Sequence, residues 1–268
     1  MTRTILDEIV TTKRRELAES IRLRPLDDVR RAADDAPPTR DFHSAVADGG
    51  AGPIRLIAEI KRRSPSAGPL RPDLRPADVA TIYEESGAAA LSVLTDARYF
   101  GGALDDIGRA RSATRLPVLR KDFMLDAYGV YEARAAGADA VLLISGILSA
   151  ARIDEYSAIA GDLGMASVVE VHRAEELAAV LPIIGAGRGA ILGINNRDLA
   201  LQRTDLATTE SLAAALPGGT PFISESGIHE PQDVRRIRRA GASAILVGEA
   251  LLRADDIGKK IKELLDSG

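Results

Sequence analysis

Two charged residues at the end of an apolar run are the first candidates for chemistry. Residues 54–60 form that run, and Glu59 and Lys61 stand two positions apart, so they share one face of an extended strand. A carboxylate and an ammonium beside a core are costly unless they pair or are used. A rim salt bridge is the ordinary interpretation of such a pair. Residues 62–68 add Arg, Ser and Gly, and favour an active-site wall that grips an anion.

Lys121 and Glu170 also stand at the ends of apolar runs. A Lys in a cavity can act as an acid on a carbonyl, or form a Schiff base if its pKa is lowered. A Glu beside apolar neighbours can become a base with a raised pKa. The alternatives are ion pairs, of Lys121 with Asp122 and of Glu170 with Arg173. Together these strand ends predict Lys/Glu acid–base chemistry.

Later strand ends carry groups suited to binding an anion. Asn195 and Arg197 can orient hydroxyls and bind an anion, or else form an Asx-type turn with a surface Arg. Glycines near the ends of the last two apolar runs suit a phosphate, which barrels often bind there. The predicted substrate- and phosphate-binding residues are Ser64, Arg197, Glu225, Ser226, Gly227 and Gly248.

Eight apolar runs alternate with helical patterns, and these elements must position the candidate residues. The predicted strands are residues 54–60, 88–94, 117–121, 139–144, 166–171, 190–194, 220–224 and 243–247. The predicted helices are residues 76–85, 104–113, 127–135, 150–162, 174–181, 208–216, 231–239 and 251–265. Glycines 87, 137 and 241 each precede such a strand, as left-handed helix caps do. This rhythm predicts an α/β fold, a (β/α)8 TIM barrel. The alternative, an open doubly wound sheet, lacks a Gly-x-Gly-x-x-Gly after the first strand.

The sequence of residues 1–50 predicts a helical N-terminal extension that contains no strands. Thr4 and Asp7 resemble a capping box, and helical patterns follow, with further short helices over 26–33 and 39–47. We expect this extension to pack across the end of a barrel formed by residues 51–268, giving one structural domain overall.

Composition excludes several kinds of protein. Hydrophobic residues make up 46% of the 268 and Cys is absent, which allows a large core and excludes a cysteine nucleophile or disulfides. The net charge of −4 disfavours nucleic acid as a partner. The sequence predicts a cytoplasmic protein with no membrane span. His43, His172 and His229 lack metal-ligand spacing, so no metal is expected, and we interpret His172 as structural.

In this order along the chain, the strand-end motifs resemble the indole-3-glycerol phosphate synthase family of tryptophan biosynthesis. The resemblance covers nearly the whole chain. The motifs that carry it are Ile-Ala-Glu-Ile-Lys-Arg-Arg-Ser-Pro-Ser at 57–66, Leu-Arg-Lys-Asp-Phe at 119–123, Val-Glu-Val-His at 169–172, Gly-Ile-Asn-Asn-Arg-Asp-Leu at 193–199 and Ser-Glu-Ser-Gly-Ile at 224–228.

The resemblance implies a carbon–carbon lyase that closes the ring of 1-(o-carboxyphenylamino)-1-deoxyribulose 5-phosphate, with loss of carbon dioxide and water. It implies Lys121 as general acid, Lys61 at the aryl carboxylate and Glu170 and Glu59 sharing the remaining proton transfers. Asn195 would orient the substrate, and no cofactor is implied. At Glu249 some relatives carry a small hydroxyl residue, so no phosphate contact is assigned to it.

Two other functions compete. Phosphoribosylanthranilate isomerase, a related barrel, uses a Cys base that this chain lacks. A non-catalytic phosphometabolite binder has no reason to place Lys121 opposite Glu170 in one cavity. A monomer or weak homo-oligomer is expected.

Overall fold

All eight predicted strands form, and they close on themselves in this computed structural model, which describes residues 4–47, 52–187, 189–198 and 203–266. The barrel strands are β1 (Arg55–Ile60), β4 (Ala90–Leu94), β5 (Val118–Lys121), β6 (Ala140–Ile144), β7 (Ala166–Val171), β8 (Ala190–Asn195), β11 (Phe222–Glu225) and β12 (Ala244–Val247). Neighbours pair in parallel, and β1 closes the ring by pairing with both β12 and β4. The predicted (β/α)8 barrel is therefore confirmed.

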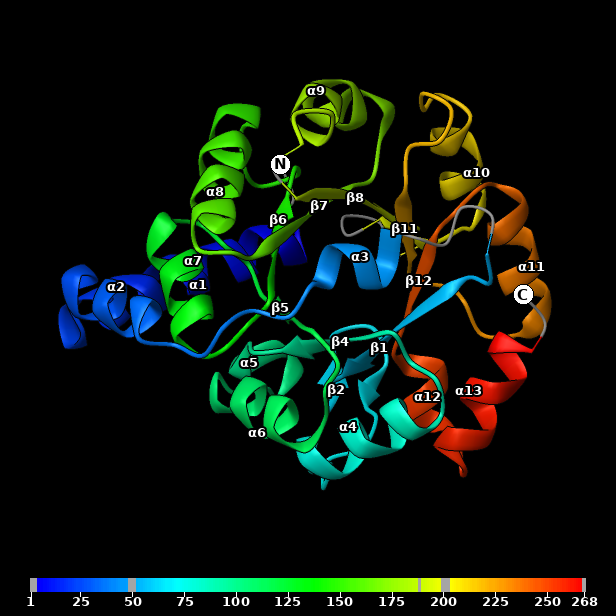
Figure 1. Cartoon of the computed structure of the whole chain (residues 1–268), viewed down its shortest axis with the longest axis horizontal. Coiled ribbons are helices and arrows are strands. Elements are labelled where there is room, and N and C mark those ends of the chain that lie inside the picture. The colour runs from blue at the N-terminus through cyan, green and yellow to red at the C-terminus, as the bar shows by residue number, and fades with distance from the viewer. Residues whose placement is uncertain (1–3, 48–51, 188, 199–202, 267–268) are drawn as a thin grey trace.

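Helices surround the ring of strands (Figure 1). Those around it are α4 (Pro76–Glu85), α6 (Asp105–Ala113), α7 (Ala127–Ala135), α8 (Ala150–Asp162), α9 (Ala174–Ile184), α10 (Ala207–Ala213), α11 (Pro231–Arg239) and α13 (Ile257–Leu265). Glycines 87, 137 and 241 have φ values of 98°, 88° and 94°, in the left-handed region predicted for them. Each turns the chain into the next strand.

Several helical predictions around the barrel differ from the structure. The helix expected over 251–265 is two helices, α12 (Glu249–Arg253) and α13, because Asp256 caps α13 by accepting a hydrogen bond from the Lys259 N–H. The helix expected to end at residue 181 continues to Ile184 through Pro182 and buries Ile183. The helix expected over 208–216 ends at Ala213. A four-residue helix, α5 (Ala97–Phe100), was not predicted.

Two short hairpins at the strand ends were also not predicted. The first pairs β2 (Arg63–Ser64) with β3 (Gly68–Pro69), and the second pairs β9 (Arg197–Asp198) with β10 (Arg203–Thr204). Strands of two residues leave too little periodicity in the sequence to be recognised.

The N-terminal segment forms α1 (Ile5–Leu23), α2 (Leu26–Asp34) and α3 (Phe42–Ala47). Thr4 and Asp7 form the predicted capping box at the start of α1. Helix α3 is shorter than the predicted 39–47, because Asp41 accepts a hydrogen bond from the Ser44 N–H at its start. The proposed boundary between extension and barrel, at residues 50 and 51, lies outside the described residues.

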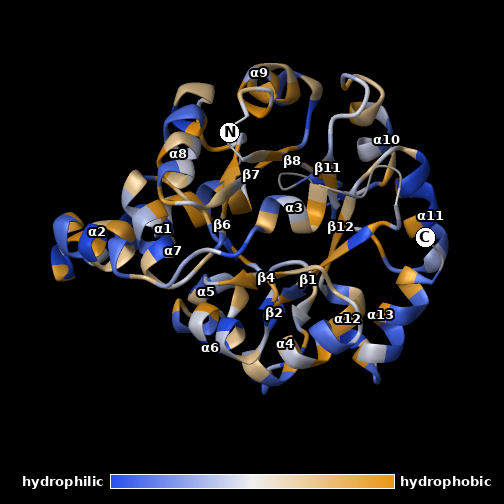
Figure 2. Ribbon diagram, in the orientation of Figure 1, coloured by the Kyte–Doolittle hydropathy of each residue, from blue (hydrophilic) through white to orange (hydrophobic). Residues whose placement is uncertain are grey.

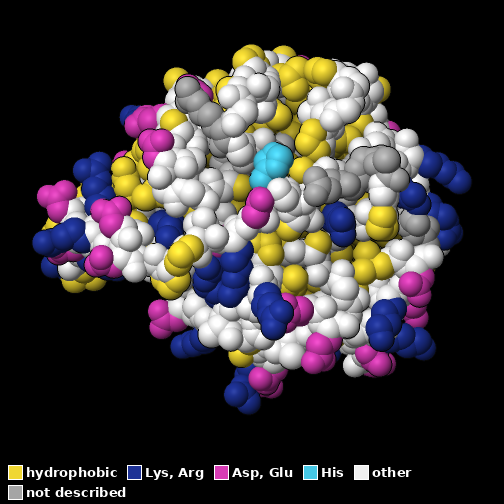
Figure 3. Space-filling model, viewed as in Figure 1, with side chains coloured by type: hydrophobic (Ala, Val, Ile, Leu, Met, Phe, Trp, Pro, Cys, Tyr) yellow, Lys and Arg dark blue, Asp and Glu magenta, His cyan; other side chains and the backbone are white. Residues whose placement is uncertain are grey.

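The apolar core has two parts, one inside the ring and one between the ring and its helices. The inner part includes Ile57, Leu119, Val168 and Ile223, and α3 adds Phe42 and Val46 to it. Helix α3 lies over the centre of the ring in Figure 1, and the barrel strands are drawn mainly in the hydrophobic colours in Figure 2. On the face drawn in Figure 3, side chains of both charges are interspersed around the rim. Within the described residues, no helix combines the length and hydrophobicity needed to cross a bilayer.

Candidate active site

Four charged side chains, one from every second strand, form the last interior layer at the carboxyl end of the barrel. They are Glu59 on β1, Lys121 on β5, Glu170 on β7 and Glu225 on β11. Each follows by two positions an interior residue of the core, namely Ile57, Leu119, Val168 and Ile223. Residues two apart on a strand face the same side, and alternate strands of such a barrel contribute to one layer. The four charges therefore meet around the barrel axis.

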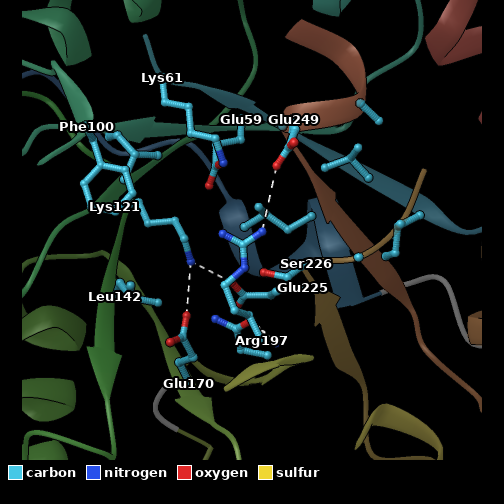
Figure 4. A pocket seen from close by; sticks show the side chains of 18 of the residues that line it. Glu59, Lys61, Phe100, Lys121, Leu142, Glu170, Arg197, Glu225, Ser226 and Glu249 are labelled. Atoms are coloured by element: carbon cyan, nitrogen blue, oxygen red, sulfur yellow. Dashed lines mark hydrogen bonds and ion pairs between the residues drawn. The ribbon is translucent and has the colours of Figure 1, made fainter. Parts of the chain in front are cut away.

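Lys121 bridges two carboxylates in this layer. Its Nζ donates to Glu225 Oε2 at 2.6 Å and to Glu170 Oε2 at 3.1 Å (Figure 4). Burial alone would lower the pKa of Lys121, but the negative charges of Glu225, Glu170 and Glu59 outweigh burial and raise it well above its usual value. Lys121 is therefore a charged ammonium that has protons to donate.

The neighbouring Asp122 points away from Lys121, so the alternative ion pair between these adjacent residues does not form. Asp122 contacts Lys13 Nζ of α1 at 2.9 Å and Arg120 at 3.2 Å. Likewise Arg173 contacts Glu176 at 2.6 Å rather than Glu170. Both catalytic candidates are thus left to face each other.

The two carboxylates that hold Lys121 differ in their proton affinity. Burial opposes ionisation of Glu170, but the charges of Lys121 and His172 outweigh it and lower the pKa of Glu170. For Glu225, burial dominates over the attraction of Lys121 and raises the pKa to about 7. The prediction that the pKa of Glu170 is raised is wrong, because Lys121 and His172 both lie close to the Glu170 carboxylate. Of the two carboxylates, Glu225 therefore has the higher proton affinity.

Glu59 and Lys61 form the ion pair that their spacing allowed. Lys61 Nζ donates to Glu59 Oε1, and both side chains line the same cavity as Lys121. Two glycines leave room for the carboxylates. A Cβ on Gly248 would lie 2.5 Å from Glu59 Oε1, and one on Gly193 would lie 2.5 Å from Glu225 Oε1. Any larger residue at these positions would displace a carboxylate.

A cavity lies above this layer, and Glu59, Lys121, Glu170 and Glu225 are among the residues that line it. One of its walls is apolar and contains Phe100, Phe123 and Leu142, which follow or lie on the neighbouring strands β4, β5 and β6. The rings of Phe100 and Phe123 lie 6.3 Å apart between centroids. This apolar wall was not predicted from the sequence. A signal was present, since Phe123 follows Lys121 by two positions in a chain with four Phe residues and no Trp.

Arg197 stands near the other end of the cavity and joins three elements. Its Nη1 donates to Ser66 Oγ at 2.5 Å, its Nε to Thr204 Oγ1 at 3.3 Å, and its Nη2 lies 3.8 Å from Glu249 Oε2. Figure 4 shows the pair with Glu249. Arg197 therefore links the first hairpin loop to the start of α12.

The other predicted site residues fall into two groups. Asn195, Ser226, Gly227 and Gly248 line the cavity with Arg197, and the Asn195 Oδ1 also accepts the Arg197 N–H at 3.0 Å, as in an Asx turn. Ser64 is not among the described lining residues. Its Oγ accepts the Ala67 N–H at 3.1 Å and so shapes the first hairpin. No metal site is formed by three or more His, Asp or Glu side chains of the described residues.

Comparison with known proteins assigns the chain to a family. The model of a family described as indole-3-glycerol phosphate synthase matches residues 6–264. The chain belongs to the indole-3-glycerol phosphate synthase family. Among its relatives is the indole-3-glycerol phosphate synthase of Albidiferax ferrireducens, 49% identical over 261 residues that cover 97% of each chain. That of Rhodopirellula baltica is 45% identical and covers 98% of this chain and all of its own.

Solved structures extend the likeness of this indole-3-glycerol phosphate synthase family member to more distant barrels. 3-Hexulose-6-phosphate synthase from Salmonella typhimurium superposes with a TM-score of 0.62 at 15% identity, over 80% of this chain and 98% of its own. Thiamine phosphate pyrophosphorylase from Pyrococcus furiosus gives 0.59 at 21% identity, over 80% and 95%. At these identities the likeness shows the fold alone.

Proposed function

We propose that the protein converts 1-(o-carboxyphenylamino)-1-deoxyribulose 5-phosphate to indole-3-glycerol phosphate, carbon dioxide and water in tryptophan biosynthesis. The observation that carries the proposal is the charged Lys121 held between Glu170 and Glu225 at the base of a cavity with an aromatic wall. This arrangement suits a reaction that must protonate a sugar carbonyl beside an aromatic ring.

The first step needs an acid. Lys121 donates a proton to the carbonyl oxygen of the sugar while the ring carbon that bears the carboxylate attacks the carbonyl carbon. Loss of carbon dioxide then leaves its electron pair in the ring and restores aromaticity. The raised pKa of Lys121 keeps its amine protonated. Glu225, beside Lys121 and with a pKa of about 7, can exchange protons with that amine.

The second step loses water. The hydroxyl made from the carbonyl leaves as water with a donated proton, assisted by the nitrogen, and a base removes a proton from the adjacent methylene carbon, so that the carbon–carbon double bond of the indole forms and the N–H is retained. Glu170 suits the base role because its pKa is lowered and its carboxylate is ionised. Glu59, paired with Lys61, is the second carboxylate available for these transfers. No cofactor is needed, because decarboxylation and aromatisation supply the driving force.

The ends of the cavity suit the two ends of the substrate. Phe100 and Phe123 can stack on the aryl ring, while Lys61 balances its carboxylate. Arg197 and the backbone at Ser226, Gly227 and Gly248 can bind the phosphate. The carboxylate of Glu249 would repel phosphate, but Arg253 at 3.0 Å and Arg197 at 3.8 Å balance its charge. Asn195 orients the sugar hydroxyls, and Ser64 acts through the hairpin it shapes.

Fluorescence of the indole product tests the function. The purified chain is mixed with the carboxyphenylamino-deoxyribulose phosphate in buffer with EDTA, and product is also identified by mass. We expect a signal that saturates with substrate. A folded chain that binds this substrate without turnover would replace the proposal with a phosphometabolite binder.

We further propose that the protein acts in the cytoplasm as a monomer or weak homo-oligomer. All the groups assigned above come from one chain, so the proposed site needs no second copy. Sedimentation velocity at micromolar concentration, with activity measured across the same range, tests this. Specific activity that falls on dilution would contradict it.

A further inference from the structure

His172 stands beside Glu170 without being among the described residues that line the cavity. Its Nε2 lies 3.4 Å from Glu170 Oε1, whereas Lys121 takes the other oxygen, Oε2. This Nε2 is buried and has no hydrogen-bond partner. Buried polar nitrogens without a partner are rare and costly, and a small movement toward Oε1 would satisfy this one.

Glu176, in the first turn of α9, fixes the imidazole from its other side. Its Oε2 lies 3.5 Å from His172 Nδ1 and accepts the His172 N–H at 2.8 Å. Arg173 donates to its Oε1 at 2.6 Å. The Ser145 hydroxyl lies 3.0 Å from Glu176 Oε2 and 2.7 Å from the Glu170 carbonyl oxygen. One carboxylate therefore reaches Glu170 by two routes, through Ser145 to its backbone and through His172 to its side chain.

We propose that His172 is a positioning residue for the reaction, which holds Glu170 by Oε1 so that Oε2 faces Lys121 and the substrate, and that Glu176 fixes His172 for this task. The inference rests on the proposed function, in which Glu170 is the base. His172 touches no substrate in this arrangement. It acts by fixing the direction of one carboxylate and by keeping that carboxylate ionised.

The charges around His172 agree with this task. Burial alone would lower its pKa, but the hydrogen bond to Glu176 and the charges of Glu170, Glu176 and Glu225 outweigh burial and raise it. The nearby cations are Lys121, across Glu170, and Arg173, on Glu176. The pKa of Glu176 falls to about 2, so Glu176 stays ionised at neutral pH. The raised pKa favours the protonated imidazole, in which Nε2 carries an N–H donor that can face Glu170.

The first test needs no substrate. The chain has three histidines, so NMR of histidine-labelled protein resolves few imidazoles, and His43→Gln and His229→Gln assign the remaining signal to His172. We expect His172 to titrate above the ordinary value of about 6.5. Glu176→Gln and Glu170→Gln should each lower that midpoint. A midpoint that does not respond to Glu170→Gln would overturn the contact.

The second test separates positioning from a structural role. His172→Leu should lower kcat roughly 10- to 100-fold with KM changed less than about threefold, because part of the contribution of a general base is lost. His172→Gln, whose amide nitrogen can reach the place of Nε2, should restore at least about fivefold. His43→Gln, on α3 at the far end of the barrel, is the matched control and should leave kcat unchanged.

The outcomes are distinct. Leu and Gln variants impaired equally, with melting temperatures lowered together, would reduce His172 to a structural residue and overturn the inference. A wild-type chain that shows the NMR response without turnover would refute the proposed function instead, while the contact between His172 and Glu170 would stand.

Discussion

Lys121 Nζ lies 2.6 Å from Glu225 Oε2, and these residues come from strands on opposite sides of the barrel. In the closed order, β5 and β11 are four strands apart, so the contact crosses the barrel axis. Such a contact is possible only because the layer beneath is filled by aliphatic side chains and the layer itself holds long polar ones. A buried ion pair of this kind contributes little to stability by itself. We infer that it is kept for chemistry.

Removal of the Lys121 amine should abolish most turnover. Lys121→Met keeps much of the aliphatic side chain and removes the proton donor, so we expect kcat to fall on the order of 10² to 10⁴. The fold should persist, because the Glu225 carboxyl can take up a proton when its cation is lost. Circular dichroism and the indole assay check both statements. Turnover within tenfold of wild type would exclude Lys121 as the acid.

Glu225 should make the protein less stable as pH rises. Its pKa of about 7 in the folded chain exceeds the unfolded value of 4.5, so folding takes up a proton between these values. The stability from this site is present below pH 4.5 and is lost as pH rises through 7. The amide of Glu225→Gln does not ionise, so this variant does not lose that stability as pH rises.

Urea unfolding of both proteins at pH 5 and pH 8 measures this effect. The stability of Glu225→Gln relative to wild type should increase toward pH 8, by up to about 3 kcal/mol. The same difference at both pH values would contradict the raised pKa.

The strand pattern was readable from the sequence because each barrel strand is buried on both faces. Aliphatic runs flanked by glycines located all eight strands to within two residues. Helix ends were less readable where a side chain decided them, as at Asp256, whose hydrogen bond to Lys259 divides the last helix. The short hairpins carried no periodic signal.

Much of the site was readable as well, because polar residues at the ends of apolar strands stand out. The sequence did not reveal which carboxylate would hold a proton, since that depends on which strands face one another across the barrel. Glu225 was predicted to bind the substrate or its phosphate, but its carboxylate accepts a hydrogen bond from Lys121 Nζ. Of the apolar wall, only Phe123 had a sign in the sequence, its position two residues after Lys121, whereas a residue such as Leu142 cannot be told from the core beside it.

Gly193 should be needed for the direction of Glu225. A Cβ at this position would lie 2.5 Å from Glu225 Oε1 and 3.1 Å from Val168. Gly193→Ala should therefore push the carboxylate toward Lys121 and lower kcat by about tenfold or more. Gly218→Ala is the matched control, because a Cβ there meets nothing within 4 Å, and its kinetics should equal wild type. Normal kinetics in Gly193→Ala would show that the layer tolerates displacement.

Asp122 should stabilise the packing of the N-terminal helices against the barrel. We propose that these helices and the barrel form one domain. Burial opposes its ionisation, but the charges of Arg120 and Lys13 outweigh burial and lower its pKa to about 2. The unfolded value is 3.8, so the stabilisation is complete above pH 4 and is lost as pH falls toward 2. It amounts to about 2 kcal/mol.

Asp122→Asn should accordingly lose stability at pH 7 and approach wild type near pH 2. Lys13→Met, which alters only the helix side of the contact, should lower the melting temperature and keep a single transition. Two separate transitions in calorimetry would show that the extension and the barrel unfold independently.

Arg197 should contribute mainly to substrate binding. Its guanidinium joins Ser66 of the first hairpin loop to Glu249 at the start of α12, at the end of the cavity assigned to phosphate. Arg197→Ala should raise KM at least about tenfold with a smaller change in kcat, because a charge-assisted phosphate contact acts in both the ground and transition states. Arg197→Lys keeps the charge without the forked geometry, so its KM should lie between those of wild type and Arg197→Ala. An unchanged KM in Arg197→Ala would move the phosphate away from Arg197, toward the backbone at Ser226 and Gly227. The paired variant Arg197→Ala with Glu249→Gln decides how much of the loss is repulsion, since removal of a carboxylate that Arg253 alone still balances should recover part of the affinity.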